Sequence, residues 1–232
     1  MPIVLITGAN RGLGLEFTKQ YAEAGWNVLA CCRSPEDAEE LLQLATRFKD
    51  LVSVHKLNVG NFYQVDELAA SLADQPIDVL INNAGVYPDS STEVFGDADY
   101  DAWMEAFRIN SLAPFKVAQA FTPHLAKGQL KKLANMTSKM GSITDNTSGG
   151  SYMYRSTKTA LNMITRSLSV DLAKQGITAI VLHPGWVLTD MGGPNALINT
   201  QQSISGLRKV IDQVTLADAG KFYAYDGQEI PW

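Results

Sequence analysis

The chain has 232 residues, of which 46% are hydrophobic and 19% are charged, values that are typical of an ordinary globular protein. This length favours one large domain, spanning residues 1–232, over two small ones. The net charge of -5 argues against a nucleic-acid-binding surface, which would need a basic patch.

Short apolar runs alternate with helical patterns from one end of the chain to the other. The expected strands are residues 3–7, 27–32, 52–57, 78–82, 132–137, 178–182 and 222–225. The expected helices are residues 14–24, 35–49, 63–72, 100–127, 152–175 and 203–214. Most strand runs are apolar at consecutive positions, as in strands that are covered on both faces. The alternation predicts an α/β fold, a doubly wound Rossmann-type parallel sheet of about seven strands with helices on both faces.

Two irregular segments, residues 138–151 and about 188–202, follow the fifth and sixth expected strands. Both are therefore expected at the carboxyl edge of the sheet, where open α/β folds bind ligands. The second segment is the candidate substrate loop. Trp186, Met191 and Val86 are candidate pocket walls, with ordinary core positions as the alternative.

The two cysteines, Cys31 and Cys32, are adjacent, so we expect buried thiols and neither a disulfide nor a thiolate metal site. His55, His124 and His183 are too scattered for a typical zinc site. The N-terminus shows neither a signal peptide nor a membrane-spanning run. A cytoplasmic protein with no metal, membrane or nucleic-acid partner is expected.

The first strand leads into the glycine-rich turn Thr7-Gly8-Ala9-Asn10-Arg11-Gly12-Leu13-Gly14, and a helix follows. Glycines allow a sharp turn and the close approach of a pyrophosphate, whose charge the helix N-terminus would stabilise. The strand before this turn and the helix after it favour dinucleotide binding over a tight turn without a ligand.

Tyr154 and Lys158 stand four residues apart in an expected helix, so they share one face. An ammonium near a phenol favours the phenolate, which would lower the tyrosine pKa and suit it to acid–base catalysis. Such pairs also arise by chance in many helices, so the interpretation depends on the other motifs. Tyr152 is a weaker candidate, because the residue four positions after it is Ser156.

The glycine-rich turn, the segment Asn82-Asn83-Ala84-Gly85 and the Tyr154/Lys158 pair occur in an order that resembles the short-chain dehydrogenase/reductase family. The resemblance covers nearly the whole chain. The glycine-rich turn, residues 146–158 and the ending 225–232 are most similar to the C-factor and sniffer-type carbonyl reductases. The family implies hydride transfer between a nicotinamide cofactor and a small carbonyl or alcohol substrate, by a homodimer or homotetramer.

The resemblance also implies the catalytic roles. Tyr154 would be the general acid, Lys158 would depress its pKa and bind the nicotinamide ribose, and Ser138 would donate a hydrogen bond to the developing oxyanion. Ser138 is preferred to Ser142 because the family's serine is followed by two residues and a glycine. Asn110 would kink the long helix and hold a relay water; a satisfied amide on the helix surface is the alternative.

Cofactor contacts are implied along the carboxyl edge of the sheet. They come from the glycine-rich turn, the ends of later strands, the Tyr/Lys pair and the segment after the sixth strand: Gly8, Asn10, Arg11, Gly12, Leu13, Gly14, Arg33, Asn58, Val59, Asn82, Ala84, Gly85, Tyr154, Lys158, Pro184, Gly185, Val187 and Thr189. Asn58 stands where relatives usually carry an aspartate that binds the adenine amino group. Asn82 ranks ahead of Asn83, for which a strand-ending turn is an equal alternative.

Two arginines indicate which nicotinamide cofactor is used. The second strand ends in Cys32-Arg33, without the acidic residue that usually binds the ribose diol of NAD. Arg33 and Arg11, which lies within the glycine-rich turn, could together bind a 2′-phosphate through charge-assisted hydrogen bonds. They favour NADP(H), and the alternative is that both arginines are solvated surface residues.

Two other functions stay open at this point. A dinucleotide-binding signalling or regulatory protein of the C-factor type would keep the cofactor site, but it would not need Ser138, Tyr154 and Lys158 together. An epimerase or dehydratase acting on a nucleotide sugar would use a similar tyrosine and lysine, but the short stretch after Thr189 leaves little room for its larger substrate domain. No Gly-x-Ser-x-Gly motif supports hydrolase chemistry.

Overall fold

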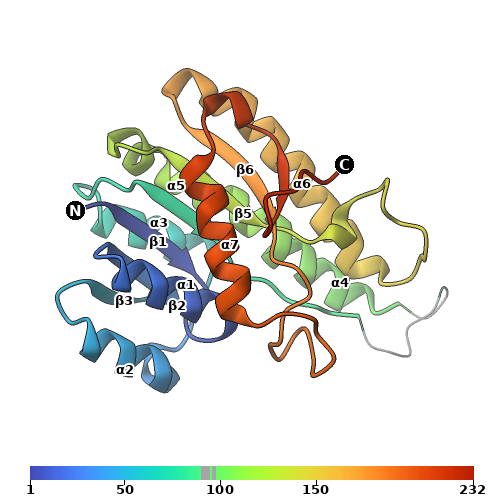
Figure 1. The fold of residues 1–232 in the computed structure, drawn as a ribbon, viewed down its shortest axis with the longest axis horizontal. Helices are drawn as coiled ribbons and strands as arrows, with labels where there is room; N and C mark the ends of the chain where they lie inside the picture. The colour runs from blue at the N-terminus through green and yellow to red at the C-terminus, as the bar shows by residue number, and fades with distance from the viewer. Residues whose placement is uncertain (90–94, 96–97) are drawn as a thin grey trace.

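The structure, a computed structural model, describes residues 1–89, 95 and 98–232 (Figure 1). Seven parallel strands form one sheet in the order β3-β2-β1-β4-β5-β6-β7, with helices on both of its faces. This is the doubly wound, Rossmann-type architecture that the alternating pattern predicts.

The strands lie within one residue of their predicted bounds: β1 (Ile3–Thr7), β2 (Asn27–Cys32), β3 (Val52–Lys56), β4 (Val79–Asn82), β5 (Lys132–Met136), β6 (Thr178–His183) and β7 (Phe222–Ala224). The helices are α1 (Gly12–Glu23), α2 (Glu39–Arg47), α3 (Phe62–Ser71), α4 (Tyr100–Phe107), α5 (Ala113–Lys127), α6 (Tyr152–Leu172) and α7 (Thr200–Gln213). Within the described ranges, no helix has the length and apolar character needed to cross a membrane.

Two of the expected helices are interrupted. Residues 35–49 form a 3₁₀ turn, Pro35–Asp37, before α2. Residues 100–127 form α4, a π-helical segment at Arg108–Leu112, and α5. Asn110 lies inside the π-helical segment, and such segments recur at functional sites because the extra residue in the turn redirects nearby side chains.

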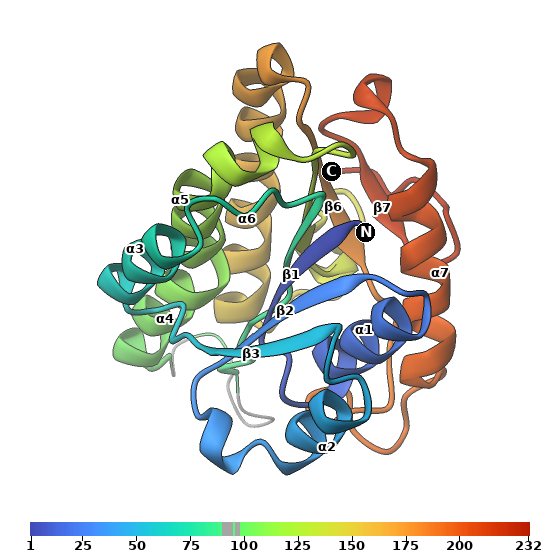
Figure 2. The same ribbon diagram turned by 90° about the vertical axis from the view of Figure 1, so that its left-hand side faces the viewer.

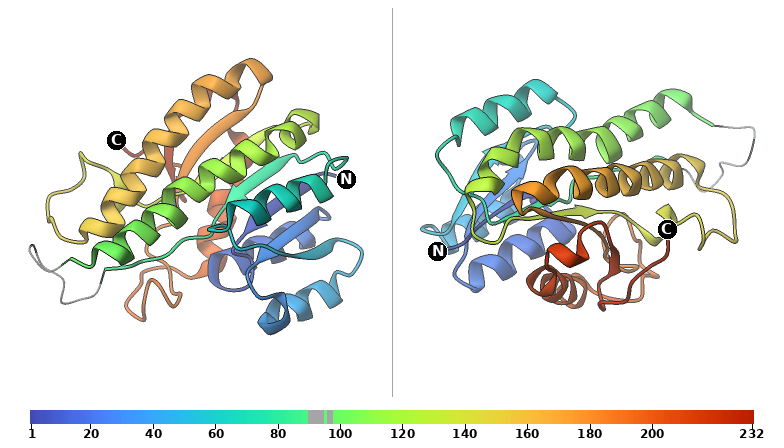
Figure 3. Two further views of the ribbon diagram at one scale, coloured as in Figure 1. Left: turned by 180° about the vertical axis from the view of Figure 1, so that it is seen from behind. Right: turned by 90° about the horizontal axis from the view of Figure 1, so that it is seen from above.

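Helices cover both faces of the sheet (Figure 2), and buried hydrophobic side chains fill the space between the helices and the sheet. On one face α1, α2 and α7 pack through residues that include Phe17, Leu41 and Leu207. On the other face α3, α5 and α6 contribute Phe121 and Leu168, and α5 and α6 run side by side across it (Figure 3). Burial on both sides explains why the strands are apolar at consecutive positions rather than at alternate ones.

The order of the strands changes direction between β1 and β4, and this point is where doubly wound sheets bind ligands. The two strand ends are tied together here. Thr7 Oγ1, at the end of β1, accepts hydrogen bonds from the backbone N–H groups of Asn83 (3.0 Å) and Ala84 (3.1 Å), just beyond β4. These two hydrogen bonds hold the ends of β1 and β4 together at the base of the crevice.

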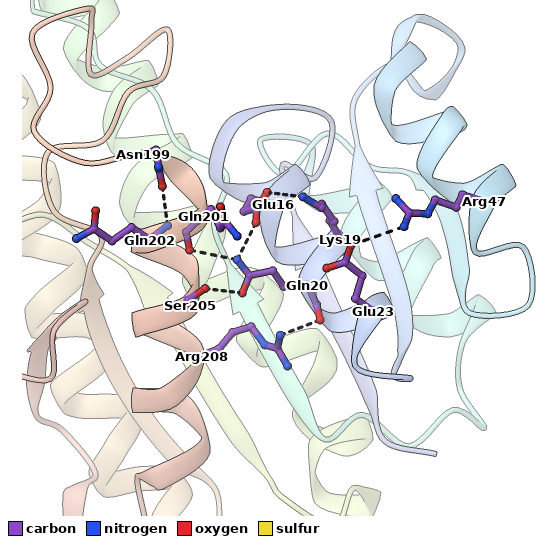
Figure 4. A network of polar contacts seen from close by, with 10 residues as sticks. All are labelled: Glu16, Lys19, Gln20, Glu23, Arg47, Asn199, Gln201, Gln202, Ser205 and Arg208. Atoms are coloured by element: carbon purple, nitrogen blue, oxygen red, sulfur yellow. Dashed lines mark hydrogen bonds and ion pairs between the residues drawn. The ribbon is translucent and has the colours of Figure 1, made fainter.

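A polar network joins α1 to α7 (Figure 4). The side-chain amide of Gln20 donates to Glu16 Oε1 (2.7 Å) and to the carbonyl of Gln201 (3.2 Å). Ser205 donates to Gln20 Oε1 (3.3 Å), and Arg208 donates to the backbone carbonyl of Gln20 (2.8 Å). The glycine-rich turn leads into α1, and the candidate substrate loop leads into α7. The network therefore connects the helices that follow these two segments.

A buried lysine ties β5 to the end of α7. Lys132 is 9% exposed, and its Nζ donates to the backbone carbonyls of Ile211 (2.6 Å) and Asp212 (2.9 Å). Burial lowers the pKa of Lys132. The carbonyls in the last turn of a helix carry partial negative charge, so they are suitable partners for an ammonium group.

We predict that Lys132→Met lowers the free energy of unfolding by about 1–2 kcal/mol, because two helix carbonyls lose a charged donor. Urea denaturation measures this change. Lys131→Met is the matched control, since it removes the same charge from the adjacent residue, and a change below about 0.5 kcal/mol is expected for it. Equal stability of Lys132→Met and the wild type would show that this contact contributes nothing.

Candidate functional site

A cavity of about 390 Å³ opens at the carboxyl edge of the sheet, where the strand order changes direction. The glycine-rich turn forms one wall through five of the predicted residues, Gly8, Asn10, Arg11, Gly12 and Leu13. Helix α1 begins at Gly12, and the side chain of Arg11, its N-cap residue, makes no capping hydrogen bond. Its first amide groups are therefore available to an anion at the cavity wall.

Gly14 contributes to the turn in a different way from the other predicted residues. It does not line the cavity, and a Cβ atom at this position would collide with the carbonyl oxygen of Gly8. Glycine at position 14 therefore lets α1 pack closely against the turn, and the residue shapes the site without touching the cavity.

Arg33 and the neighbouring Cys32 line the cavity beyond β2. The guanidinium of Arg11 forms an ion pair with Asp190, which lies in the candidate substrate loop. Both side chains of this pair are exposed, so the pair is accessible to a competing anion. The two arginines predicted to bind a phosphate thus line the same cavity, and one of them already contacts a carboxylate.

Asn58 and Val59 line the cavity beyond β3. The Oδ1 atom of Asn58 accepts a hydrogen bond from the N–H of Gly60 (3.0 Å), and the backbone N–H of Asn58 donates to Gln64 Oε1 (2.9 Å). The side chain is therefore held by its own turn, and one lone pair of Oδ1 is already used.

The wall after β4 is formed by Asn83, Ala84 and Gly85 rather than by Asn82. Asn82 is only 3% exposed, and its side-chain amide donates to Asn135 Oδ1 (2.8 Å) in the interior. Asn83 and not Asn82 thus lines the cavity, and a cofactor contact by Asn82 stays a prediction. Asn82 is the last residue of β4 and its side chain is directed toward β5, whereas Asn83 lies beyond the strand.

Tyr154 and Lys158 reach the cavity from the buried face of α6. The two side chains are 8% and 4% exposed, respectively. Lys158 Nζ lies 5.6 Å from the centre of the Tyr154 ring and donates to the carbonyl of Met136 (2.9 Å), at the end of β5. The structure therefore brings the pair together as the helical spacing predicts.

Burial controls the proton affinity of both groups. Desolvation raises the pKa of Tyr154 to about 12, while the Ser138 hydroxyl lowers it and Tyr87 raises it by smaller amounts. Desolvation also lowers the pKa of Lys158 to about 8. The expected net lowering of the tyrosine pKa is not found, because burial disfavours the phenolate more than its surroundings favour it.

Ser138 directly follows Thr137, which lines the cavity, although Ser138 itself does not line it. Its Oγ accepts a hydrogen bond from the backbone N–H of Met140 (3.1 Å), and its hydroxyl lowers the pKa of Tyr154. Ser142 instead donates to the carbonyl of Pro231 (2.7 Å). The geometry favours Ser138 over Ser142 as the serine of the site.

Asn110 is fully buried, so it is not an amide on the helix surface. Its Oδ1 accepts from the N–H of Val86 (2.9 Å), and its Nδ2 donates to the carbonyl of Val86 (2.9 Å) and to Thr157 Oγ1 (3.1 Å). A π-helical segment interrupts the long helix at this residue. Asn110 holds the backbone just after β4 against α6.

The segment after β6 contributes Pro184 and Thr189 to the cavity, but not Gly185 or Val187. Gly185 has a φ of +86°, and a Cβ there would lie 2.7 Å from Ile198 Cδ1. Val187 is 4% exposed and forms a β-bridge with Ile198. These two residues shape the base of the candidate substrate loop rather than the cavity wall.

The candidate substrate loop ends earlier than predicted, since α7 begins at Thr200 and the side chain of Asn199 caps it by accepting from the N–H of Gln202 (2.8 Å). Met191 lines the cavity, as does Val86 after β4. Trp186 does not line it, and its indole N–H donates to the carbonyl of Gly192 (2.7 Å). That hydrogen bond fixes the first half of the loop.

Residues 2–197 match the model of the short chain dehydrogenase family. The chain belongs to this family. It is 46% identical to C-signal of Myxococcus xanthus over 164 residues, which cover 71% of this chain and 98% of that protein. The structure of the carbonyl reductase Sniffer of D. melanogaster superimposes with a TM-score of 0.93 and is 36% identical in sequence. The structure of the NADPH-bound carbonyl reductase from chicken fatty liver superimposes with a TM-score of 0.91 and is 33% identical. Each comparison covers 100% of both chains.

Several cavity residues of this short-chain dehydrogenase were not found from the sequence. Leu57, Met136 and Thr137 lie at or just beyond the carboxyl ends of strands, so the rule that ligands bind at the carboxyl edge could have found them. Glu105 and Ile109 reach the cavity from α4 and the π-helical segment. Nothing in a helical pattern alone marks such positions as ligand-facing.

We predict that the stability of the short-chain dehydrogenase relative to its Lys158→Met variant rises with pH by about 2 kcal/mol between pH 7.5 and 9.5. Burial lowers the folded-state pKa of Lys158 to about 8 from its ordinary value of 10.5, so between these two pH values the unfolded chain binds more protons than the folded one. Urea denaturation of both proteins across this range measures the difference. A constant difference would show that Lys158 keeps an ordinary pKa.

Proposed function

We propose that this short-chain dehydrogenase is an NADP(H)-dependent carbonyl reductase, which reduces a small ketone or aldehyde and, in the reverse direction, oxidises the alcohol. The observation that carries this proposal is the convergence of Tyr154 and Lys158 on one cavity, with Ser138 next to the cavity residue Thr137 and the N-terminus of α1 at another wall. The similarity to two solved carbonyl reductases, one of them NADPH-bound, supports it. A homodimer or homotetramer is part of the proposal and follows from the family resemblance alone, while a cytoplasmic location follows from the expectation of neither a signal peptide nor a membrane-spanning run.

The cavity walls carry groups that suit nicotinamide adenine dinucleotide phosphate. The amide groups at the start of α1 suit a pyrophosphate, and Arg33 with Arg11 suits a 2′-phosphate. Thr189 would bind the carboxamide, and Lys158 would bind the nicotinamide ribose. The bound cofactor would supply or accept the hydride, while the protein supplies position and electrostatics.

In the reductive direction, Tyr154 donates its phenolic proton to the substrate oxygen. With a pKa of about 12, the phenol is protonated at neutral pH and ready to act as the acid. Ser138 donates a hydrogen bond to the same oxygen as negative charge develops on it. Lys158, with a pKa of about 8, is mostly protonated at pH 7, and its positive charge stabilises the tyrosinate that remains.

The similarity to C-signal does not favour a purely regulatory role for this chain. Binding of a dinucleotide needs the glycine-rich turn and the arginines, but it does not need a hydroxyl pair beside a buried ammonium. Burying the Lys158 ammonium costs free energy, as its lowered pKa shows. A group that is costly to bury and that cofactor binding does not need supports turnover over binding alone.

We predict that Tyr154→Phe lowers kcat for carbonyl reduction by about 10²–10⁴-fold, because it removes the general acid. Oxidation of NADPH and NADH, followed across a panel of aldehydes, ketones and quinones, measures the effect. Tyr152→Phe is the matched control, since it removes a hydroxyl two residues away on the exposed side of α6. If the wild type binds NADPH and reduces nothing in the panel, the regulatory alternative replaces the enzymatic one.

We predict that Arg33→Ala weakens NADPH binding by about 10–100-fold and leaves NADH binding unchanged, since only NADPH carries the 2′-phosphate. Asp190→Asn should tighten NADPH binding by about two- to fivefold, because it frees the Arg11 guanidinium from a competing carboxylate. Fluorescence titration of both cofactors measures the dissociation constants. Arg47→Ala, on α2 and away from the cavity, is the control. Equal effects on NADH and NADPH would contradict the assigned phosphate site.

A further inference from the structure

Tyr154, the proposed general acid, lies in the first turn of α6, where the helix itself offers no acceptor for the backbone amide groups. Tyr154 is the third residue of α6. Ser151, which precedes the helix, has a φ of +46° and gives no side-chain cap. The residues next to α6 in the sequence therefore leave its first turn without a side-chain cap.

Asp89 supplies the missing cap from 65 positions upstream of Tyr154. Its Oδ1 accepts from the backbone N–H of Met153 (3.2 Å), and its Oδ2 accepts from the backbone N–H of Tyr154 itself (2.8 Å). A carboxylate at this position is favoured both by the charge-assisted hydrogen bonds and by the positive end of the helix dipole. Asp89 is half-buried, which shields these bonds from competing water.

The same short segment also contacts the phenol ring. The ring of Tyr87 packs against that of Tyr154, with centroids 4.7 Å apart and planes tilted by 47°. The Tyr87 hydroxyl lies 3.0 Å from Ser151 Oγ, so it contacts the residue just before α6. Two residues apart in the sequence, Tyr87 and Asp89 thus hold the side chain and the backbone of Tyr154.

The segment is itself anchored on the wall of the cavity. Val86 exchanges two hydrogen bonds with the buried side-chain amide of Asn110, which in turn donates to Thr157 on α6. Residues 86–89 therefore join the end of β4 to the first turn of α6. Lys158, one turn further along, is held separately by the carbonyl of Met136.

We propose that Asp89 is a positioning residue for the Tyr154 hydroxyl, acting through the backbone amide of Tyr154 and assisted by Tyr87. This inference rests on the proposed carbonyl reductase function. Proton donation needs the phenol within hydrogen-bond reach of the substrate oxygen, and a displacement of about 1 Å at a reacting group can cost about 10²-fold in rate. The predicted cofactor contacts at the glycine-rich turn and Arg33 do not pass through Asp89, so its loss affects kcat rather than NADPH binding.

Kinetics of three variants test the proposal, with the carbonyl compound that the wild type reduces fastest. Asp89→Ala should lower kcat by about 10–100-fold with the dissociation constant for NADPH changed less than about twofold. Asp89→Asn keeps an acceptor oxygen and should recover kcat to within about threefold of the wild type, since asparagine caps helices about as well as aspartate. Asp99→Ala is the matched control, because Asp99 caps α4 by accepting from the N–H of Ala102 (2.9 Å), and it should leave kcat unchanged.

A kcat for Asp89→Ala within about twofold of the wild type, or an equal loss in Asp99→Ala, would overturn the proposal. Amide hydrogen exchange of the peptide covering residues 151–158 gives a second readout that does not require turnover. Faster exchange in Asp89→Ala than in the wild type or Asp99→Ala supports the positioning role, even if the wild type reduces no carbonyl and the proposed function fails. Unchanged exchange in Asp89→Ala overturns it.

Discussion

The burial of a phenol and an ammonium side by side is the constraint on which the site depends. Taking Tyr154 and Lys158 out of water raises the pKa of the first to about 12 and lowers that of the second to about 8. Burial disfavours the charged form of each group, although Lys158, with a pKa of about 8, is still mostly protonated at pH 7. The same low dielectric makes the attraction between Lys158 and a tyrosinate strong once a proton has left. Burial that costs stability in the resting protein therefore helps the acid act.

Such a site requires backbone partners that do not move, and the carboxyl edge of the sheet provides them. Lys158 donates to the last carbonyl of β5, and Thr7 at the end of β1 holds the backbone beyond β4. Strands packed on both faces are the most rigid elements available, whereas the loops beyond them are not. The network between α1 and α7 then fixes the candidate substrate loop against the glycine-rich turn (Figure 4).

The sequence predicts the sheet almost to the residue, because strands buried on both faces are apolar at consecutive positions. It also places Tyr154 and Lys158 on one helix face, which depends only on a four-residue spacing. It does not give the pKa of Tyr154, since burial results from packing by distant elements. It does not show that Asn83 rather than Asn82 lines the cavity, because the Asn82 side chain is held in the interior by a hydrogen bond to Asn135 on β5. The pairing of Arg11 with Asp190 and the cap from Asp89 join residues far apart in the chain, and no local pattern encodes them.

The hydrogen bonds of Asn110 explain why the long helix contains a π-helical segment. An ordinary helix through residues 100–127 would leave Asn110 to compete with its own backbone, as asparagine does within helices. In the π-helical segment its amide instead satisfies both backbone groups of Val86 and still reaches Thr157 on α6. From Val86 the chain leads within three residues to Asp89 and the first turn of α6. The π-helical segment is thus the first of a series of contacts that runs through Asn110, Val86 and Asp89 to the backbone amide of Tyr154. The irregular helix geometry at Asn110 therefore helps to hold Tyr154, the proposed general acid, in place.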